Sequence, residues 1–345
     1  MNTDNMTDSH GGGGAFARLL ERLGRHLFAS QAAQTRAFRN EIEEVRVMVQ
    51  RLTTKVEQVA ASQKQVDKIL SNQRVDEKFR QIFRGQLSAL IRAQYLPTDL
   101  PAPLALQARR FRLRSQNEED GIILALFEAV GVETRRFVEI GSGGTGGNSA
   151  VLAHDLGWTG LMVDASKRAV RVATHEFRSR PGVQVARAFV DTASVNALLE
   201  SHGMTGAIDL LSIDIDSIDY WLLQAITACN ARVLIVEYNA HFGPSRAVTL
   251  PNAPPPSGAP LEYFGASLGA LNKAAEARGY RLVLCENSGV NAFFVRRDLA
   301  PTLPTLPVDV AYRPFRHRLR DEDEVRTPDD VFAQIQSLGL PLVDV

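Results

Sequence analysis

A run of apolar residues leads directly into a glycine-rich segment at residues 137–149, FVEIGSGGTGGNS. A short apolar run favours a buried strand, and glycine supplies the positive φ angles that a tight turn after such a strand requires. Gly141 and Gly143 also carry no side chain, so the backbone there can approach a ligand closely. The segment therefore predicts a strand, a tight turn and a helix, which together open a doubly wound α/β sheet.

From about Arg109 the chain alternates short apolar runs with amphipathic segments. Most runs are apolar throughout, as in parallel strands that helices cover on both faces. Only residues 287–291 separate the last two runs, too few for a crossover helix, so the last strand is expected to be antiparallel. The expected strands are Phe137–Gly141, Gly160–Asp164, Val183–Val190, Asp209–Asp214, Arg232–Tyr238, Tyr280–Glu286 and Ala292–Arg296. The expected helices are Ile122–Val130, Ser149–Leu156, Lys167–Arg178, Ser194–Ser201, Asp219–Ala228 and Leu261–Arg278.

The chain before this region has a different composition. Its first residues are polar and glycine-rich, which predicts disorder. A proline-free stretch follows, in which apolar residues recur at the alternating steps of four and three that are typical of a coiled coil. We interpret this seam as a self-association device that gives a homo-oligomer; the alternative is one long helix folded back on the next domain. The expected divisions are disorder at 1–14, helix at 15–95 with the coiled coil at about 38–70, a linker at 96–108, the α/β domain at 109–298 and a C-terminal extension at 299–345.

The bulk composition narrows the range of partners. Lys+Arg and Asp+Glu each number 39, so the zero net charge gives no reason to expect a nucleic acid or an acidic membrane as partner. No apolar run approaches the roughly 20 residues that a membrane span needs, so no transmembrane segment is expected. The two cysteines, Cys229 and Cys285, are expected in a helix and a strand as buried thiols, without a disulfide. A cytoplasmic location is the resulting expectation.

Six motifs follow one another between Arg114 and Asp298: RSQNEEDGII, FVEIGSGGTGGNS, LLSIDIDSIDYW, VLIVEYNAHFGPS, EYFGASLGAL and NSGVNAFFV. In this order they resemble the FkbM-type S-adenosylmethionine-dependent methyltransferases, and more closely the bacterial subgroup found with surface-glycan genes. The resemblance implies a Rossmann-like class I methyltransferase fold, S-adenosylmethionine as cofactor and O-methylation of a sugar or glycan hydroxyl. A glycan or a sugar-bearing small molecule is then the expected partner.

The glycine-rich segment supplies the first expected cofactor contacts. In a methyltransferase its turn, with Gly141, Ser142 and Gly143, faces the methionine part of the cofactor, and Glu139 helps to orient that end. Gly141, Gly143 and Gly146 also satisfy the dinucleotide fingerprint G-x-G-x-x-G, so an NAD-dependent oxidoreductase is the enzyme alternative. Glu139 inside the strand end and the expected antiparallel hairpin argue against it.

Three further residues are expected at the cofactor. Asp164 ends the second expected strand, where its two oxygens suit both ribose hydroxyls; capping the following helix is its alternative role. The family pattern places Asp191 near the adenine amino group, with helix capping as a nearly equal alternative. Ser115 and Glu118 match a capping box, and the resemblance adds that Gln116 touches the ligand site.

Carboxylates follow the fourth and fifth expected strands, at the edge where open α/β sheets bind ligands. Asp214 ends the fourth strand, Asp216 follows in the loop, and Glu237 ends the fifth strand. Because methyl transfer to a hydroxyl requires a base within hydrogen-bond reach, these three are the candidate catalytic residues, with His241 a distant alternative. The same three oxygen donors would suit Mg²⁺ and are the candidate metal ligands. Asp219 is expected to stabilise the first turn of the next helix.

Two other segments are unusual in composition. Residues 244–260 are proline-rich, and a loop of this length is often a lid or a binding loop; beyond it, Tyr263 and Phe264 are expected to pack either on a sugar or in the core. Basic residues 313–320 precede acidic residues 321–324, which predicts an exposed, self-neutralising segment. A coiled-coil scaffold with a catalytically silent methyltransferase domain is the non-enzyme alternative.

Overall fold

The computed structural model describes residues 106–107, 109–316 and 326–345. Its elements up to the middle of the sheet are α4 (Glu119–Val130), β1 (Arg136–Ile140), η1 (Gly147–Ser149), α5 (Ala150–Asp155), β2 (Thr159–Asp164), α6 (Lys167–Glu176), β3 (Val183–Arg187), α7 (Val195–Ser201) and β4 (Gly206–Ile213). The remaining elements are α8 (Asp219–Ala225), β5 (Cys229–Glu237), η2 (Ala240–Phe242), β6 (Val248–Thr249), α9 (Leu268–Ala277), β7 (Tyr280–Cys285), β8 (Asn291–Arg296), α10 (Val308–Ala311), α11 (Pro328–Ser337) and β9 (Val343–Asp344).

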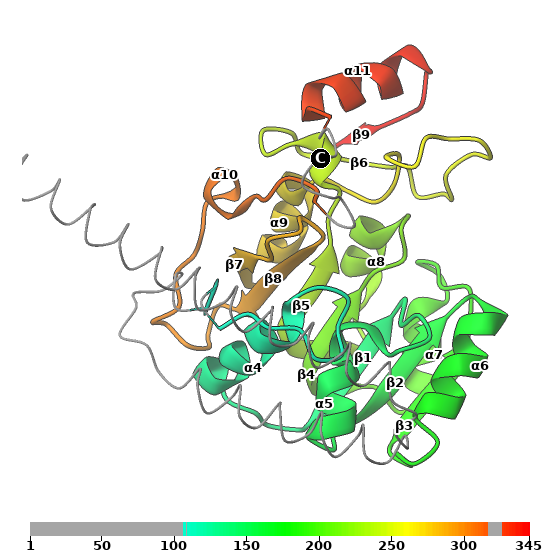
Figure 1. The fold of residues 1–345 in the computed structure, drawn as a ribbon, viewed down its shortest axis with the longest axis vertical. Helices are drawn as coiled ribbons and strands as arrows, with labels where there is room; N and C mark the ends of the chain where they lie inside the picture. Colours follow the sequence, from blue (N-terminus) through cyan, green and yellow to red (C-terminus); the bar gives the residue numbers. More distant parts are fainter. Residues whose placement is uncertain (1–105, 108, 317–325) are drawn as a thin grey trace, which may run out of the picture. The chain divides into compact units, whose positions relative to one another are not determined.

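Seven strands form one sheet in the order β3-β2-β1-β4-β5-β8-β7 (Figure 1). The pairs among β1 to β5 are parallel, whereas β8 runs antiparallel to both of its neighbours. Strand β8 turns back on β7 through residues 286–290, as the short connection predicts. A Rossmann-like α/β sheet with an antiparallel last strand is therefore confirmed.

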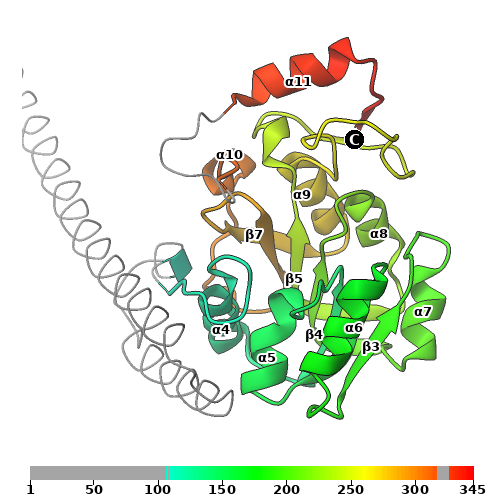
Figure 2. The ribbon, with the colours of Figure 1, turned by 45° about the vertical axis from the view of Figure 1, so that its right-hand side comes forward.

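Helices cover both faces of this sheet (Figure 2). Helices α4, α5 and α6 pack on the face that carries Phe137, Leu210 and Ile235. Helices α7, α8 and α9 pack on the other face. Alternate strand residues share a face, so the side chains of Glu139 and Glu237 lie on the side of α4, α5 and α6. Both side chains lie at the carboxyl edge of the sheet, where β1 and β5 end.

Two predicted helix boundaries are wrong. The helix expected over Leu261–Arg278 begins only at Leu268, where the side chain of Ser267 caps it by accepting the N–H of Ala270. Helix α8 ends at Ala225, and Cys229 begins β5, although the sequence predicted helix over Asp219–Ala228 and placed Cys229 in a helix. Backbone pairing of β5 with the first residues of β4 extends the strand beyond its apolar part. Cys229 and Cys285 are both buried free thiols, as predicted.

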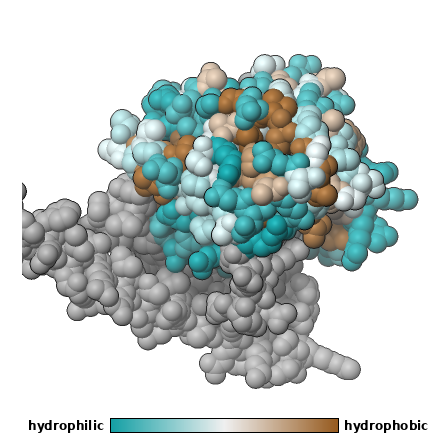
Figure 3. Space-filling model, turned by 90° about the horizontal axis from the view of Figure 1, so that it is seen from above, coloured by the Kyte–Doolittle hydropathy of each residue, from teal (hydrophilic) through white to brown (hydrophobic). Residues whose placement is uncertain are grey.

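The connection between β5 and α9 packs on the C-terminal residues 326–345. Strands β6 and β9 pair antiparallel, and Val331 of α11 packs in one apolar cluster with Phe242 of η2. Trp221 of α8 donates its indole N–H to the carbonyl oxygen of Leu250 at 2.8 Å, which joins this connection to α8. The face that carries α11, seen from above in Figure 3, combines hydrophilic residues with a central apolar area.

The predictions for residues 1–14 and 15–95, including the coiled coil at 38–70, lie outside the described residues, as does most of the linker at 96–108 and the acidic run at 321–324. Among the helices that the structure describes, none has the length and apolar character of a membrane span.

Candidate functional site

The turn after β1 lies against the end of β4. Gly141 has a φ of 91°, in the left-handed region, and its N–H donates to the carbonyl oxygen of Val163 at 2.9 Å. A Cβ at this position would overlap the carbonyl oxygen of Asp214, whose own N–H donates to Ile140 at 2.9 Å. The backbone conformation and the close approach both require glycine here.

Glu139 holds the end of the glycine-rich segment by hydrogen bonds to its backbone. Its two carboxylate oxygens accept the backbone N–H groups of Asn148 and Ser149, each at 3.0 Å. These N–H groups belong to the start of η1 and α5, where a helix N-terminus favours negative charge. Burial raises the pKa of Glu139 to about 7 in spite of these hydrogen bonds. The structure therefore shows a loop-holding role for Glu139, and its contact with a cofactor stays a prediction.

Asp164 ties the glycine-rich turn to β2. Its Oδ2 accepts the N–H of Gly143 at 2.9 Å, and its Oδ1 accepts the N–H of Ser166 at 2.7 Å. The helix cap proposed as its alternative role belongs to Ser166, whose Oγ accepts the N–H of Ala169. Each carboxylate oxygen keeps a further lone pair, and a Cβ at Gly143 would meet no described atom within 4 Å. A half-buried carboxylate and an open stretch of backbone thus lie side by side.

Asp191 closes the turn that precedes α7. Its Oδ1 accepts the N–H groups of Ala193 and Ser194 at 3.0 and 2.7 Å. The hydroxyl of Ser194 also donates to this oxygen and lowers the pKa of the exposed carboxyl group. These bonds close the turn that leads into α7, whose N-cap residue Ser194 makes no side-chain capping bond, and the contact with adenine stays a prediction. Ser142 is buried in the turn, with its N–H on the carbonyl oxygen of Val163.

The capping box predicted ahead of α4 is wrong. Helix α4 begins at Glu119, and the reciprocal contact involves Asp120: its N–H donates to Ser115 Oγ, and its Oδ2 accepts the N–H of Ser115. Glu118 instead forms an ion pair with Arg110 at 3.0 Å. Gln116 is exposed in the segment that leads into α4, at the carboxyl edge of the sheet.

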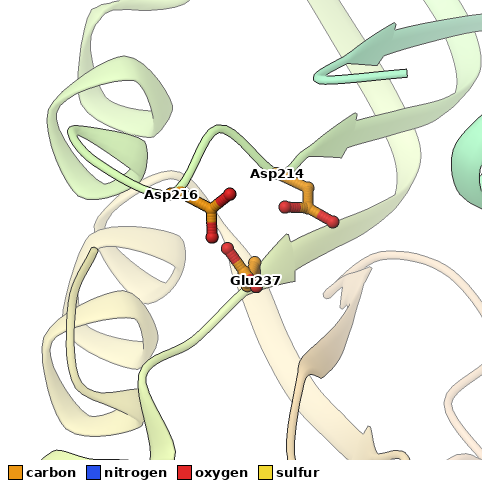
Figure 4. Close-up of side chains that lie close together, drawn as sticks. All are labelled: Asp214, Asp216 and Glu237. Atoms are coloured by element: carbon orange, nitrogen blue, oxygen red, sulfur yellow. The ribbon is translucent and has the colours of Figure 1, made fainter. Parts of the chain in front are cut away.

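Three carboxylates face one another where β4 and β5 end (Figure 4). Asp214 follows the last residue of β4, Asp216 lies in the loop before α8, and Glu237 is the last residue of β5. One oxygen of each lies within 4.8 Å of the others. Asp214 and Glu237 are half-buried, while Asp216 is exposed. The structure thus brings together the three acids that the sequence singled out.

The pKa values of Asp214 and Glu237 are both raised. Burial, followed by the nearby charge of Asp219, raises the pKa of Asp214 to about 8. Burial and the charge of Asp214 raise the pKa of Glu237 well above its ordinary value. The two side chains share a hydrogen bond, and Glu237 Oε2 is buried without a partner among the described residues. A pair of this kind can take up or release a proton near neutral pH.

Asp219 shapes the loop that presents Asp216. Its two oxygens accept the N–H groups of Ile215 and Ser217, at 2.9 and 3.0 Å. Between these two residues, Asp216 has a φ of 56°, in the left-handed region that favours glycine. Asp219 is fully buried as the first residue of α8, so its expected structural role is confirmed, with the loop as well as the helix as its target.

The raised pKa of Asp214 predicts how stability depends on pH. The folded protein binds this proton more tightly than the unfolded chain does, so the folded state carries more protons between the ordinary value of 3.8 and about 8. The free energy of unfolding is therefore expected to fall as the pH rises through this range. Urea unfolding across the range should show a smaller fall for Asp214→Asn than for the unsubstituted chain. Equal pH dependence in the two proteins would contradict this assignment.

Two other predicted side chains lie beside the β5–α9 connection. His241 is half-buried in η2 and stacks on Phe315, with 4.7 Å between ring centroids, and burial lowers its pKa. His241 is therefore packed against a neighbouring ring, and its role as an alternative base stays a prediction. Tyr263 is buried and donates its hydroxyl to the carbonyl oxygen of Pro341, so it packs in the core and not on a ligand. Phe264 is half-buried, and its carbonyl oxygen accepts the side-chain N–H of Asn239.

The sequence did not point to four buried polar residues beneath the carboxylates. They are Glu119, Asn148, Ser212 and Asn291. Each lies inside a quoted motif, but their meeting depends on strand register, which pairs Glu139 with Ser212 and Glu237 with Asn291. An asparagine at the first position of an otherwise apolar last strand was the available signal.

No family model and no curated protein matches the chain. Among solved structures, it is similar to an O-methyltransferase from Bacillus cereus in complex with S-adenosylhomocysteine (SAH). The sequence identity is 17% and the TM-score 0.34, over 66% of this chain and 94% of that one. It is also similar to the SAH-bound N-terminal domain of EvdMO1, at 15% identity and a TM-score of 0.36, over 64% and 95% of the two chains. A third is the Methanococcus jannaschii fibrillarin pre-rRNA processing protein, at 12% identity and a TM-score of 0.35, over 53% and 75%.

The strand order, not these similarities, carries the fold class. A parallel sheet whose last strand is inserted antiparallel between the fifth strand and the edge strand is the sheet of class I methyltransferases. The chain therefore has a Rossmann-like α/β fold of that class.

Proposed function

We propose that this chain is an S-adenosylmethionine-dependent methyltransferase that methylates a hydroxyl group of a sugar or glycan. The observation that supports it most is the contact between Gly141 and the backbone of Asp214. This contact places the glycine-rich turn directly beside the three carboxylates. A cofactor bound at the turn would therefore lie next to groups that can bind an acceptor and take its proton.

The residues at the turn fit S-adenosylmethionine. The open side of Gly143 leaves room for a ligand against the backbone, and Asp164 offers free lone pairs beside it for the two ribose hydroxyls. Ser142 contributes to the same turn, and Asp191 and Gln116 lie at the same edge of the sheet, as further proposed contacts. When bound, S-adenosylmethionine supplies a methyl group on a positively charged sulfur.

The carboxylates supply what the acceptor needs. We assign the general base to Asp214, which in its ionised form would accept the proton of the acceptor hydroxyl. Glu237 and Asp216 would accept hydrogen bonds from neighbouring hydroxyls and hold the reacting oxygen in line with the methyl group. A sugar, with hydroxyls on adjacent carbons, suits three acceptor groups within 4.8 Å of one another.

The experiment that tests this function is label transfer. The full chain is incubated with methyl-labelled S-adenosylmethionine and a glycan fraction of a bacterial lysate, and the labelled product is identified. Label on a sugar hydroxyl supports the proposal, and label on an amine overturns its O-methylation part. Binding of the cofactor with no transfer to any fraction would favour the scaffold alternative.

The Mg²⁺ site stays a prediction on the same three residues. Asp214, Asp216 and Glu237 are hard oxygen donors, and the buried Glu237 Oε2 has no partner in the described part of the chain. If Mg²⁺ binds, calorimetric titration with the metal should give a saturable signal that Asp216→Asn weakens. If the binding heat of Mg²⁺ is no greater for the unsubstituted chain than for Asp216→Asn, the metal site at these residues is contradicted.

Self-association through residues 38–70 and a cytoplasmic location also stay proposals. Both were expected from composition and pattern alone. Neither bears on the assignment of the carboxylates.

A further inference from the structure

Six polar side chains are buried under the carboxyl edge of the sheet, on the side of α4 and α5. They come from different elements or their flanks and are at most 4% exposed: Glu119, Glu139, Asn148, Ser212, Glu286 and Asn291. Buried polar groups on this scale are costly unless each is hydrogen-bonded. The hydrogen bonds among these six side chains therefore show which elements of the fold they hold in place.

Asn291, the first residue of β8, is at the centre of these contacts. Its Nδ2 donates to Glu119 Oε1 at 3.0 Å, and its Oδ1 accepts from Asn148 Nδ2 at 3.5 Å. Asn148 Nδ2 also donates to Ser212 Oγ at 3.1 Å. Glu119 Oε2 in turn accepts the N–H of Asn117 at 2.8 Å. One amide thus joins the start of α4 to the start of η1.

These partners belong to both halves of the proposed site. Asn148 follows the glycine-rich turn, and its N–H donates to Glu139. Asn291 is the direct register partner of Glu237, one of the three carboxylates. Glu119 fixes Asn117, which is next to the exposed Gln116. Asn291 therefore links the two halves: a displacement of the glycine-rich turn would move Asn148, and through Asn291 it would also displace the strand end that carries Glu237.

The direction of the hydrogen bonds makes asparagine specific at this position. Glu119 can only accept when ionised, and Asn148 Nδ2 can only donate, so the residue between them must donate on one side and accept on the other. An amide does both. Aspartate has the same shape but would set a second buried carboxylate against Glu119, and a partly satisfied buried network is less stable than a complete one.

We propose that Asn291 is a positioning residue for the cofactor, acting through Asn148 on the glycine-rich turn and through Glu119 on the segment before α4. The inference rests on the proposed function, because it takes S-adenosylmethionine as the ligand of that turn. Asn291 itself is buried beneath the turn and is assigned no contact with the cofactor.

The test uses S-adenosylhomocysteine (SAH) as the probe and calorimetry on the full chain. Asn291→Asp is expected to lower the affinity for SAH by about tenfold, the size of a typical coupling between linked sites. The double variant Asn291→Asp with Glu119→Gln exchanges donor and acceptor, because the glutamine amide can donate to the new carboxylate. Most of the lost affinity is expected to return in this double variant.

Asn196→Asp is the matched control. Asn196 lies on α7 at the other face of the sheet, where its Nδ2 donates to Ala225 and its Oδ1 accepts from Thr227 and Ala228. The same substitution there disturbs a comparable set of hydrogen bonds away from the turn, so the affinity for SAH should stay unchanged.

The possible outcomes separate cleanly. Unchanged affinity in Asn291→Asp would overturn the inference, and so would a loss that Glu119→Gln does not reverse or that Asn196→Asp reproduces. An unsubstituted chain that does not bind SAH would overturn the proposed function itself, and the positioning role with it. Loss with recovery in the double variant supports both.

Discussion

Replacing Gly141 by alanine is expected to lower the free energy of unfolding by about 3 kcal/mol or more, the sum of a strained backbone and an overpacked contact. Alanine would have to adopt a φ of 91° and fit a methyl group where the carbonyl oxygen of Asp214 lies. The two segments cannot move apart freely, because the N–H of residue 141 and the N–H of Asp214 each donate to a carbonyl oxygen of an adjacent strand. Urea unfolding measures the change, and calorimetry with SAH should show no binding.

Gly143→Ala separates stability from binding in the same turn. Its φ of 56° lies where alanine costs only about 1–2 kcal/mol, and its Cβ would meet no described atom within 4 Å. The stability loss should therefore be the smaller of the two, while the methyl group enters the space assigned to the cofactor and weakens SAH binding. Unaltered SAH affinity in Gly143→Ala would place the cofactor elsewhere.

Asp214→Asn is expected to slow methyl transfer by about 10²–10⁴-fold, the usual contribution of a general base. Asparagine keeps the size of the side chain and a hydrogen bond to Glu237 but cannot take a proton. Because the cofactor turn contacts Asp214 through its backbone carbonyl, SAH affinity should stay close to that of the unsubstituted chain. Transfer of labelled methyl groups to the acceptor measures the rate.

Asp216→Asn serves as the comparison. Asp216 is exposed and belongs to the same cluster, so its loss should affect the acceptor KM more than the rate at saturation. An Asp214→Asn protein as active as the unsubstituted chain would remove the base assignment. In that case Glu237, whose pKa is also raised, becomes the next candidate.

Much of the sheet could be predicted from the sequence, because its strands are short runs of apolar residues buried on both faces. Val138, Leu211 and Leu234, for example, are all fully or almost fully buried. The antiparallel last strand also followed from local chain length, since residues 286–290 cannot hold a helix. These features depend on periodicity and spacing, which a sequence displays directly.

The boundary at Cys229 could not be predicted in the same way. Residues 229–232 are not a continuous apolar run, and they become strand because the first residues of β4 offer backbone partners. The packing of residues 326–345 on the β5–α9 connection is likewise a tertiary contact, carried by β6, β9 and the Val331 cluster. Propensity gives no signal for such pairings.

The candidate site also contains residues that the sequence predicts and residues that only the tertiary structure brings together. Asp214, Asp216 and Glu237 were predicted together because strand ends of one direction meet at one edge. The links through Asn148 and Asn291 were not, because they depend on which residues of neighbouring strands stand in register. The sequence suggested Asp191 as a cap of the next helix, but its carboxylate closes the turn just before α7, and this difference of a few residues is also one that the sequence does not display.

The most direct test of the central claim is a pair of calorimetric titrations of the full chain, one with S-adenosylmethionine and one with NAD. Both cofactors place a nucleoside near a glycine-rich turn and a carboxylate such as Asp164. Saturable binding of S-adenosylmethionine that Gly143→Ala weakens, with no heat from NAD, is the predicted result. Binding of NAD without binding of S-adenosylmethionine would contradict it.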